Sequence, residues 1–198
     1  NKAITSEEQR KRNNGEDWKE NKAGNVSRCN LIDKDNWFYE TVLKKLTERI
    51  FYRDWDNFSK YRIEVEEGIS LPEFELYNLW VNYQKQHEFN PLHGHRGFCS
   101  FVVFMKIPTH WEEQHSLPFT THSNMPCASD FAFVWSKNNT SDIFKCTFPL
   151  SPKDEGRILF FPAWLEHLVH PFYGTEEERI TISGNIIFGN SNKIKNSQ

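Results

Sequence analysis

Hydrophobic and polar residues divide the chain into a polar start, one helical stretch and a series of short strands. Residues 1–28 hold few large apolar groups, and 11 of the first 22 residues are charged, with both signs mixed. Such a segment cannot bury enough apolar surface to order itself. We therefore expect an extended or partly disordered arm over 1–28, and a solvated polar tail over 191–198.

After the arm, apolar residues recur at helical spacing. Asp33 or Asp35 is suited to cap a helix that runs to about Phe51. The apolar side chains of this helix repeat every three or four residues and share one face: Tyr39, Val42, Leu43, Leu46 and Ile50. We expect that face to lie on the outside of a sheet.

From residue 73 onward the pattern becomes that of strands. In Glu73–Tyr83 alternate residues fall on opposite sides, and one side carries Phe74, Leu76, Asn78, Trp80 and Asn82. Turns containing Pro, Asn or Gly separate the further strands that we predict, at Gly97–Ile107, Phe131–Trp135, Phe144–Phe148, Arg157–Phe161 and Glu178–Phe188.

A helix followed by at least six short strands predicts a mainly β fold with flanking helices. The expected architecture is a double-stranded β-helix, a jelly-roll or cupin-like barrel formed by residues 29–190 as a single domain with an N-terminal helix. A chain of 198 residues is long enough for one such domain. Barrels of this kind hold small-molecule sites in their mouths, between the two sheets.

One predicted loop, Pro108–Asp130, is unusually long for a compact domain. It contains three histidines and Cys127. We favour a lid over the site, then a plain surface loop. A zinc site is the third alternative, because the spacing of these residues matches no common zinc pattern.

Composition and charge narrow the functional classes. The net charge is -3 and the pI about 6.3, so a broad basic surface for nucleic acid is not expected. The four cysteines are far apart, which favours a reducing compartment, the cytoplasm, or the host cytoplasm if the chain is viral. No apolar stretch approaches the roughly 18 residues of a membrane helix.

Two histidines stand two residues apart in Asn90-Pro91-Leu92-His93-Gly94-His95. On an extended backbone, residues i and i+2 point to the same side, about 6.6–7 Å apart at Cα, and their imidazoles can converge on one metal ion. On a helix they would diverge. The pair alone is a weak signal, and two incidental surface or core histidines are the more usual explanation of it.

A third histidine, His167, follows an apolar strand and a Pro-Ala-Trp-Leu corner, so we expect it at a turn between two strands. His170 is its local competitor as a ligand. Three residues further along an extended backbone, it should face the opposite side. We favour His167 as the ligand and assign His170 a structural or supporting role.

Arg179 begins the last predicted strand, and it shares one face with Thr181, Ser183 and Asn185. If that face points into the barrel, an unpaired guanidinium there would be costly, so it needs an anion. Its planar, always charged fork suits a carboxylate, and the Thr181 hydroxyl stands beside it. The alternative is a structural salt bridge with Glu176, Glu177 or another acid.

The order His-x-His, a late His and then Arg-x-Thr resembles the Fe(II)/2-oxoglutarate-dependent oxygenases. Trp80-Val81-Asn82-Tyr83-Gln84, followed by Phe89-Asn90-Pro91-Leu92-His93-Gly94-His95, is similar to compact oxygenases common in phage and marine microbial sequences. The resemblance covers about residues 73–188. It implies a non-haem dioxygenase that uses Fe(II), 2-oxoglutarate and O2. The enzyme would hydroxylate an unidentified protein side chain or small molecule and release succinate and CO2.

The resemblance also implies roles for individual residues. Fe(II) would be held by His93, His95 and His167. Arg179 with Thr181 would bind the distal carboxylate of 2-oxoglutarate. Asn82 and Asn185 would make further polar contacts in the pocket.

The sequence departs from the family pattern at His95, where Asp or Glu is usual. A third imidazole leaves the metal site one charge unit more positive. Glu88 and Glu166 could supply a carboxylate, but neither stands at the expected spacing. The alternatives are therefore a three-histidine cupin-type dioxygenase without 2-oxoglutarate, and a non-catalytic jelly-roll binding module.

Overall fold

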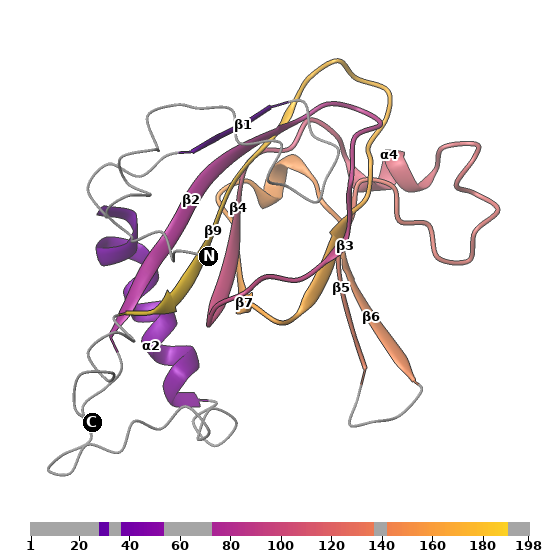
Figure 1. Ribbon diagram of the computed structural model, residues 1–198. Helices are drawn as coiled ribbons and strands as arrows, with labels where there is room; N and C mark the ends of the chain where they lie inside the picture. The colour runs from indigo at the N-terminus through magenta and orange to yellow at the C-terminus, as the bar shows by residue number, and fades with distance from the viewer. Residues whose placement is uncertain (1–27, 32–36, 54–72, 137–141, 190–198) are drawn as a thin grey trace, which may run out of the picture.

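The computed structural model describes residues 28–31, 37–53, 73–136 and 142–189, which form two antiparallel sheets with a helix on one side (Figure 1). The strands are β1 (Arg28–Leu31), β2 (Phe74–Gln84), β3 (Asn90–His93), β4 (Cys99–Lys106), β5 (Phe131–Ser136), β6 (Ile143–Phe148), β7 (Ile158–Pro162), β8 (Glu166–Val169) and β9 (Arg179–Phe188). The helical segments are η2 (Tyr39–Leu43), α2 (Lys44–Arg53), α4 (Trp111–His115) and the 3₁₀ turn η4 (Pro152–Asp154).

The strand order confirms the double-stranded β-helix. One sheet has the order β1-β2-β9-β4-β7 and the other β3-β8-β5-β6. From β2 to β9 the chain crosses repeatedly between the two sheets, and it stays in one sheet only for the β5–β6 hairpin. This winding is that of a jelly roll, with the site between the two layers.

The long pair of β2 and β9 forms one wall of the space between the sheets. Their register runs from Phe74 opposite Phe188 to Gln84 opposite Arg179, with an irregularity between Leu76 and Asn78. Beyond this irregularity, the even-numbered residues of β2 and the odd-numbered residues of β9 face the same side. Polar side chains of both strands therefore line one surface.

The helix covers the outer face of the five-stranded sheet, as predicted, and lies on the opposite side of it from β5 and β6 (Figure 1). The predicted face is confirmed in part: Tyr39 and Leu43 are buried, and Val42 and Ile50 are partly buried against the same core. Thr47 and Phe51 are buried as well, although the pattern did not single them out. The first turn, η2, is π-helical, and its wider turn shifts which residues face the sheet. Thr47 fits at a buried position because its hydroxyl donates to the Leu43 carbonyl at 2.8 Å.

A second apolar cluster fills the space between the sheets at one end of the barrel. It contains Phe104 from β4, Phe131 and Phe133 from β5, and Phe161 from β7. Phe104, Phe131 and Phe161 of this cluster also line the cavity described below.

All six predicted strands are present. The sequence pattern did not reveal β1, β3 and β8, which have four residues each. The predicted helix caps, most of the arm and the tail lie outside the described residues; β1 begins at Arg28, where the arm was expected to end. None of the described helices is long and apolar enough to span a membrane.

Candidate functional site

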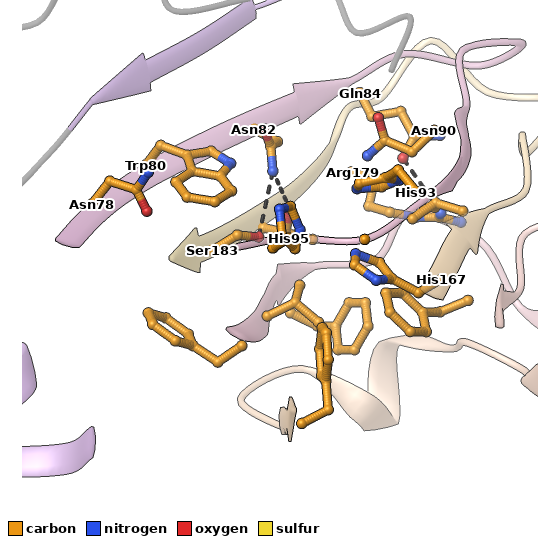
Figure 2. Close-up of a pocket in the computed structure, with 18 residues that line it drawn as sticks. Asn78, Trp80, Asn82, Gln84, Asn90, His93, His95, His167, Arg179 and Ser183 are labelled. Carbon is orange, nitrogen blue, oxygen red and sulfur yellow. Dashed lines mark hydrogen bonds between the residues drawn. The ribbon is translucent and has the colours of Figure 1, made fainter. Parts of the chain in front are cut away.

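Three histidines meet at the open end of the barrel. His93 ends β3, His95 follows it in the next loop, and His167 lies in β8 directly opposite His93 (Figure 2). One ring nitrogen from each lies within 4.8 Å of the other two. The ring centroids are 4.3 to 5.0 Å apart. The expectation of a turn at His167 was wrong, because Glu166–Val169 pairs with strands on both sides.

Backbone carbonyls orient two of these rings. Nδ1 of His93 lies 2.7 Å from the Pro91 carbonyl, and Nδ1 of His167 lies 3.1 Å from the Leu165 carbonyl. Because a carbonyl only accepts, Nδ1 carries the proton in both rings, which makes Nε2 the ring nitrogen without a hydrogen. Metal-binding histidines are commonly held in this way.

The loop that carries His95 is pinned to its neighbours. The His95 backbone N–H donates to the Ala163 carbonyl at 2.9 Å, and Ala163 N–H donates to the Phe98 carbonyl at 3.1 Å. Gly97 has φ +126°, and a Cβ there would lie 2.7 Å from the Ile186 carbonyl oxygen. Only glycine fits this close approach, so the short connection from β3 to β4 fixes the position of His95.

Burial keeps the central imidazole neutral. Desolvation, with a smaller contribution from the neighbouring His93 and against the raising effect of the Leu165 carbonyl, lowers the pKa of His167 to about 4. At neutral pH the ring therefore offers a lone pair rather than a charge. Three imidazole nitrogens are a donor set that suits a divalent first-row transition metal.

No carboxylate of the described residues joins the cluster. Within the described ranges, these three histidines are the only group of potential metal-ligating side chains whose ligand atoms come together. Glu166 is exposed, and Glu88 accepts a hydrogen bond from Lys85 N–H at 2.7 Å. His170 does not line the cavity, and its Nδ1 lies 3.7 Å from Cys127 Sγ.

A cavity of about 250 Å³ opens beside the histidines. Figure 2 shows the side chains of β2 in a row along it, from Asn78 through Trp80 and Asn82 to Gln84. β9 contributes Arg179, Thr181 and Ser183, and phenylalanines of β4, β5 and β7 form an apolar side. Among the described residues that line the cavity, Arg179 alone carries a permanent charge.

Arg179 is buried, with 1% of its surface exposed. Its Nη2 donates to the carbonyl and the hydroxyl oxygen of Ser129, at 2.9 and 2.5 Å, and Nη1 donates weakly to Gln84 Oε1 at 3.4 Å. The ring of Phe172 lies under the guanidinium at 5.0 Å. Nε has no hydrogen-bond partner among the described residues.

Among the residues that the structure describes, no carboxylate forms a salt bridge with the buried guanidinium; Asp130 is near enough only for a weaker electrostatic effect. The predicted alternative, a salt bridge to Glu176 or Glu177, is absent: Glu177 pairs with Lys106, and Glu176 accepts from Gln86. Burial lowers the pKa of Arg179 to about 10, against an opposing effect of Asp130, so the group stays charged at neutral pH. A buried, incompletely paired cation beside a cavity is suited to receive an anion.

Two other predicted polar residues lie in the same wall. Asn82 Nδ2 donates to Thr181 Oγ1 at 3.3 Å and to Ser183 Oγ at 3.5 Å. Thr181, two residues from Arg179 on the same face, leaves its hydroxyl at the cavity surface. Asn82 and Thr181 thus line the stretch next to the guanidinium.

Asn185 does not line the cavity, contrary to expectation. Its backbone and side-chain N–H groups both donate to Asn78 Oδ1, at 3.1 and 3.0 Å, and its own Oδ1 accepts from the Ser100 hydroxyl at 2.8 Å. Asn78 lines the cavity instead, and the two hydrogen bonds from Asn185 fix the position of its side chain.

The loop Pro108–Asp130 contributes no residue to the cavity lining. Its helix α4 is held away from the cavity lining by Gln114, which exchanges two hydrogen bonds of 2.9 Å with the backbone of Tyr173. His115 Nε2 lies 2.8 Å from Asp130 Oδ1. The histidines of this fully described loop join no metal-ligating cluster. Only Ser129, at the end of the loop, reaches the site, through Arg179.

The sequence pattern placed Asn78 and Trp80 on the correct face of β2 but gave no reason to single them out. Gln84 and Ser129 were missed. Gln84 continues the same alternation by one residue, so that alternation could have revealed it. Nothing in the sequence links Ser129 to an arginine 50 residues away.

Comparison with known proteins adds a family to this geometry. Residues 78–185 match the family model described as "Putative 2OG-Fe(II) oxygenase". No curated protein matches the chain.

Several solved structures are similar in shape, at low identity. A Pseudomonas putida prolyl-4-hydroxylase is 12% identical, with a TM-score of 0.48, covering 92% of this chain and 82% of that one. A cupin superfamily protein from Desulfitobacterium hafniense is 11% identical, with a TM-score of 0.29 and coverage of 63% and 84%. The Drosophila melanogaster CENP-C cupin domain is 6% identical, with a TM-score of 0.30 and coverage of 71% and 96%.

Proposed function

Because this chain belongs to the 2OG-Fe(II) oxygenase family, we propose that it is a non-haem dioxygenase that uses Fe(II), 2-oxoglutarate and O2 to hydroxylate a protein side chain or small molecule. The observation that carries the proposal is the pairing of two features in one cavity: a cluster of three imidazoles, and a buried guanidinium that forms no salt bridge with any described carboxylate. A dicarboxylate that binds a metal at one end needs a cation for its other end.

His93, His95 and His167 would hold the metal through one nitrogen each. The metal, 2-oxoglutarate and O2 supply the oxidising chemistry, in which the co-substrate becomes succinate and CO2 as the target gains a hydroxyl group.

The protein's own contribution is to bind, orient and shield. Arg179 would receive the distal carboxylate, which would satisfy the unpartnered Nε–H and lower the cost of burying the guanidinium. The Thr181 hydroxyl stands beside it as a second donor. Phe131 and Phe161 form the apolar side of the cavity and exclude water from it.

The test is an anaerobic titration of the Fe(II)-loaded protein with 2-oxoglutarate. We expect a visible charge-transfer band that is lost in Arg179→Ala. Arg157→Ala is the matched control, because Arg157 is exposed and pairs with Asp154 away from the cavity, at 3.0 Å. The control should keep the band.

A second candidate is a three-histidine cupin-type dioxygenase, in which Arg179 would bind a carboxylate of the target itself. The third imidazole, in place of the usual Asp or Glu, favours this alternative. It predicts Fe(II) binding without the band. A non-catalytic jelly-roll module predicts that Fe(II) leaves the stability of the protein unchanged.

A further inference from the structure

We propose that Ser129 is a positioning residue for the co-substrate: it sets which N–H groups of Arg179 face the anion, and thereby the affinity and chain-length selectivity for the 2-oxo acid. This inference rests on the proposed function.

The contacts of Ser129 are concentrated on one nitrogen of the guanidinium. Its carbonyl and hydroxyl oxygens accept both hydrogens of Arg179 Nη2, at 2.9 and 2.5 Å. Thr109 Oγ1, 3.2 Å from Ser129 Oγ, can accept the serine's own hydroxyl hydrogen, which leaves the Oγ lone pairs for the arginine. Ser129 and Thr109 are both buried, so water does not compete for these bonds.

These bonds determine which N–H hydrogens of the guanidinium remain available to an anion. A guanidinium carries five N–H hydrogens. Ser129 occupies the two on Nη2, and Gln84 takes one on Nη1 at the long distance of 3.4 Å. The Nε hydrogen and the second Nη1 hydrogen remain. Both two-donor edges of a guanidinium include Nη2, so an incoming carboxylate meets single N–H groups, on Nε or on Nη1, and Ser129 thereby sets the side from which the anion approaches.

The backbone of Ser129 indicates that this position is specifically maintained. Its φ is +74°, and His87 is the only other non-glycine residue with positive φ among those the structure describes. Hydrogen bonds hold the conformation on both sides: Ser129 N–H donates to the Pro171 carbonyl at 2.8 Å, and Asp130 N–H donates to the Cys127 carbonyl at 3.1 Å. Glycine would adopt this φ without strain, so what serine adds here is its hydroxyl group.

A purely structural role would also account for these hydrogen bonds, because a buried cation needs acceptors. The two roles differ in a measurable way. A structural role changes the stability of the protein and weakens all ligands equally. A positioning role changes the ratio of affinities for two anions that differ only in length.

The experiment compares Ser129→Gly with the unsubstituted protein, using 2-oxoglutarate and 2-oxoadipate, which is one methylene longer, as probes. Glycine keeps the carbonyl and the backbone conformation and removes only the hydroxyl. We expect the Kd for 2-oxoglutarate, from the anaerobic Fe(II) band, to rise about tenfold, the effect of one hydrogen bond to a charged group. The Kd for 2-oxoadipate should rise by less, so that selectivity falls. In the 15N-labelled metal-free protein, rotation about the Cζ–Nη2 bond of Arg179 should become faster.

Two further variants make the test specific. His87→Gly relieves the other left-handed residue, which is exposed, and should change neither Kd. The Arg179→Lys variant lacks the guanidinium on which Ser129 acts. Adding Ser129→Gly to that variant should therefore raise the Kd for 2-oxoglutarate by less than twofold.

The outcomes separate the two proposals. A band in the unsubstituted protein, with the same Kd ratio in Ser129→Gly, would overturn the role of Ser129 and leave the oxygenase proposal intact. A full tenfold effect in the Arg179→Lys background would also overturn it. Absence of the band in the unsubstituted protein would overturn both.

Discussion

His93 and His167 face each other across β3 and β8 as register partners, with ring centroids 4.3 Å apart. Each ring is held at Nδ1 by the carbonyl of the residue two positions earlier in its own segment. The two rings are therefore oriented before any ion binds. Little conformational entropy remains to be lost on binding, which favours tight binding of a metal.

Metal binding should stabilise the fold. Co(II), which resists air oxidation better than Fe(II), at a hundredfold excess over its Kd should add about 2.7 kcal/mol to the free energy of unfolding. For a domain of this size that is a rise in Tm of about 5–10 °C. His167→Ala should abolish the rise, and His122→Ala, in the exposed part of the long loop, should preserve it. Thermal denaturation with and without Co(II) measures this; an equal rise in His167→Ala would contradict the assigned ligand set.

The third imidazole should set the metal preference of the site. His95→Asp would restore two histidines and a carboxylate, and the added negative charge should tighten Mn(II), a metal that favours oxygen ligands, by about tenfold. His95→Asn has the same shape without the charge and should bind Mn(II) no better than the unsubstituted protein. An EPR titration of free Mn(II) gives both constants. Equal constants for the Asp and Asn variants would mean that residue 95 does not contact the metal.

The close pairing of β2 and β9 should depend on Gly184. A Cβ there would collide with the Asn78 carbonyl oxygen and approach the Phe101 ring at 2.7 Å. We expect Gly184→Ala to lower the free energy of unfolding by about 3 kcal/mol through overpacking. Gly174→Ala is the control: it has φ +83° and open space around it, so only the backbone strain of about 1 kcal/mol applies. Urea denaturation compares them, and similar losses would show that the close approach is relieved by a shift of the strands.

The sequence predicted the parts of the fold that follow simple periodicity. The alternation in β2 and β9 placed Asn82, Arg179 and Thr181 on one surface, and the spacing of His93 and His95 placed two imidazoles on one side. Both placements follow from the alternation of side chains along an extended strand, and this alternation can be recognised from the local sequence alone.

What the sequence did not reveal depends on contacts between distant segments. β3 is short and contains Pro91, so its own residues give little strand signal, and it is a strand because β8 lies beside it. By alternation Asn185 lies on the same face of the strand as Arg179. Its side chain, however, is hydrogen-bonded to Asn78 and Ser100 of neighbouring strands and does not reach the cavity. Ser129 has a left-handed backbone conformation, which a glycine at this position would have indicated in the sequence but a serine does not.

Acid should destabilise the protein partly through His170. Burial, followed by repulsion from Lys145 and Arg179, lowers its pKa from 6.5 to about 4. The unfolded chain therefore binds more protons between these values. The corresponding stability is fully present above pH 6.5 and is lost as the pH falls toward 4.

The variant His170→Gln should remove this contribution. In metal-free protein, the loss of unfolding free energy between pH 7 and pH 4.5 should be smaller in the variant by on the order of 1–2 kcal/mol, since partial exposure weakens the effect. Urea denaturation at the two pH values measures it. His167 titrates in both proteins, so its effect cancels in the comparison. An unchanged pH dependence would mean that His170 is not held neutral by the fold.

A chain of hydrogen bonds runs from Ser100 through Asn185 to Asn78. The stability of the protein should depend on residue 185 having both a donor and an acceptor. Asn185 donates to Asn78 and accepts from Ser100, so a neutral amide fits, whereas a carboxylate places two acceptors against each other. Asn185→Asp should cost about 3 kcal/mol at pH 7, because it loses a buried bond and brings in a buried charge.

At pH 4 the cost of Asn185→Asp should shrink, because burial raises the pKa of the new carboxyl group and its protonated form regains a donor for Asn78. Asn124→Asp, in an exposed part of the long loop, should change the stability by less than about 0.5 kcal/mol at either pH. Urea denaturation of the metal-free variants at both pH values distinguishes the cases. A cost for Asn185→Asp that is the same at pH 4 and pH 7 would show that Asn78 Oδ1 does not depend on a donor from the side chain of residue 185.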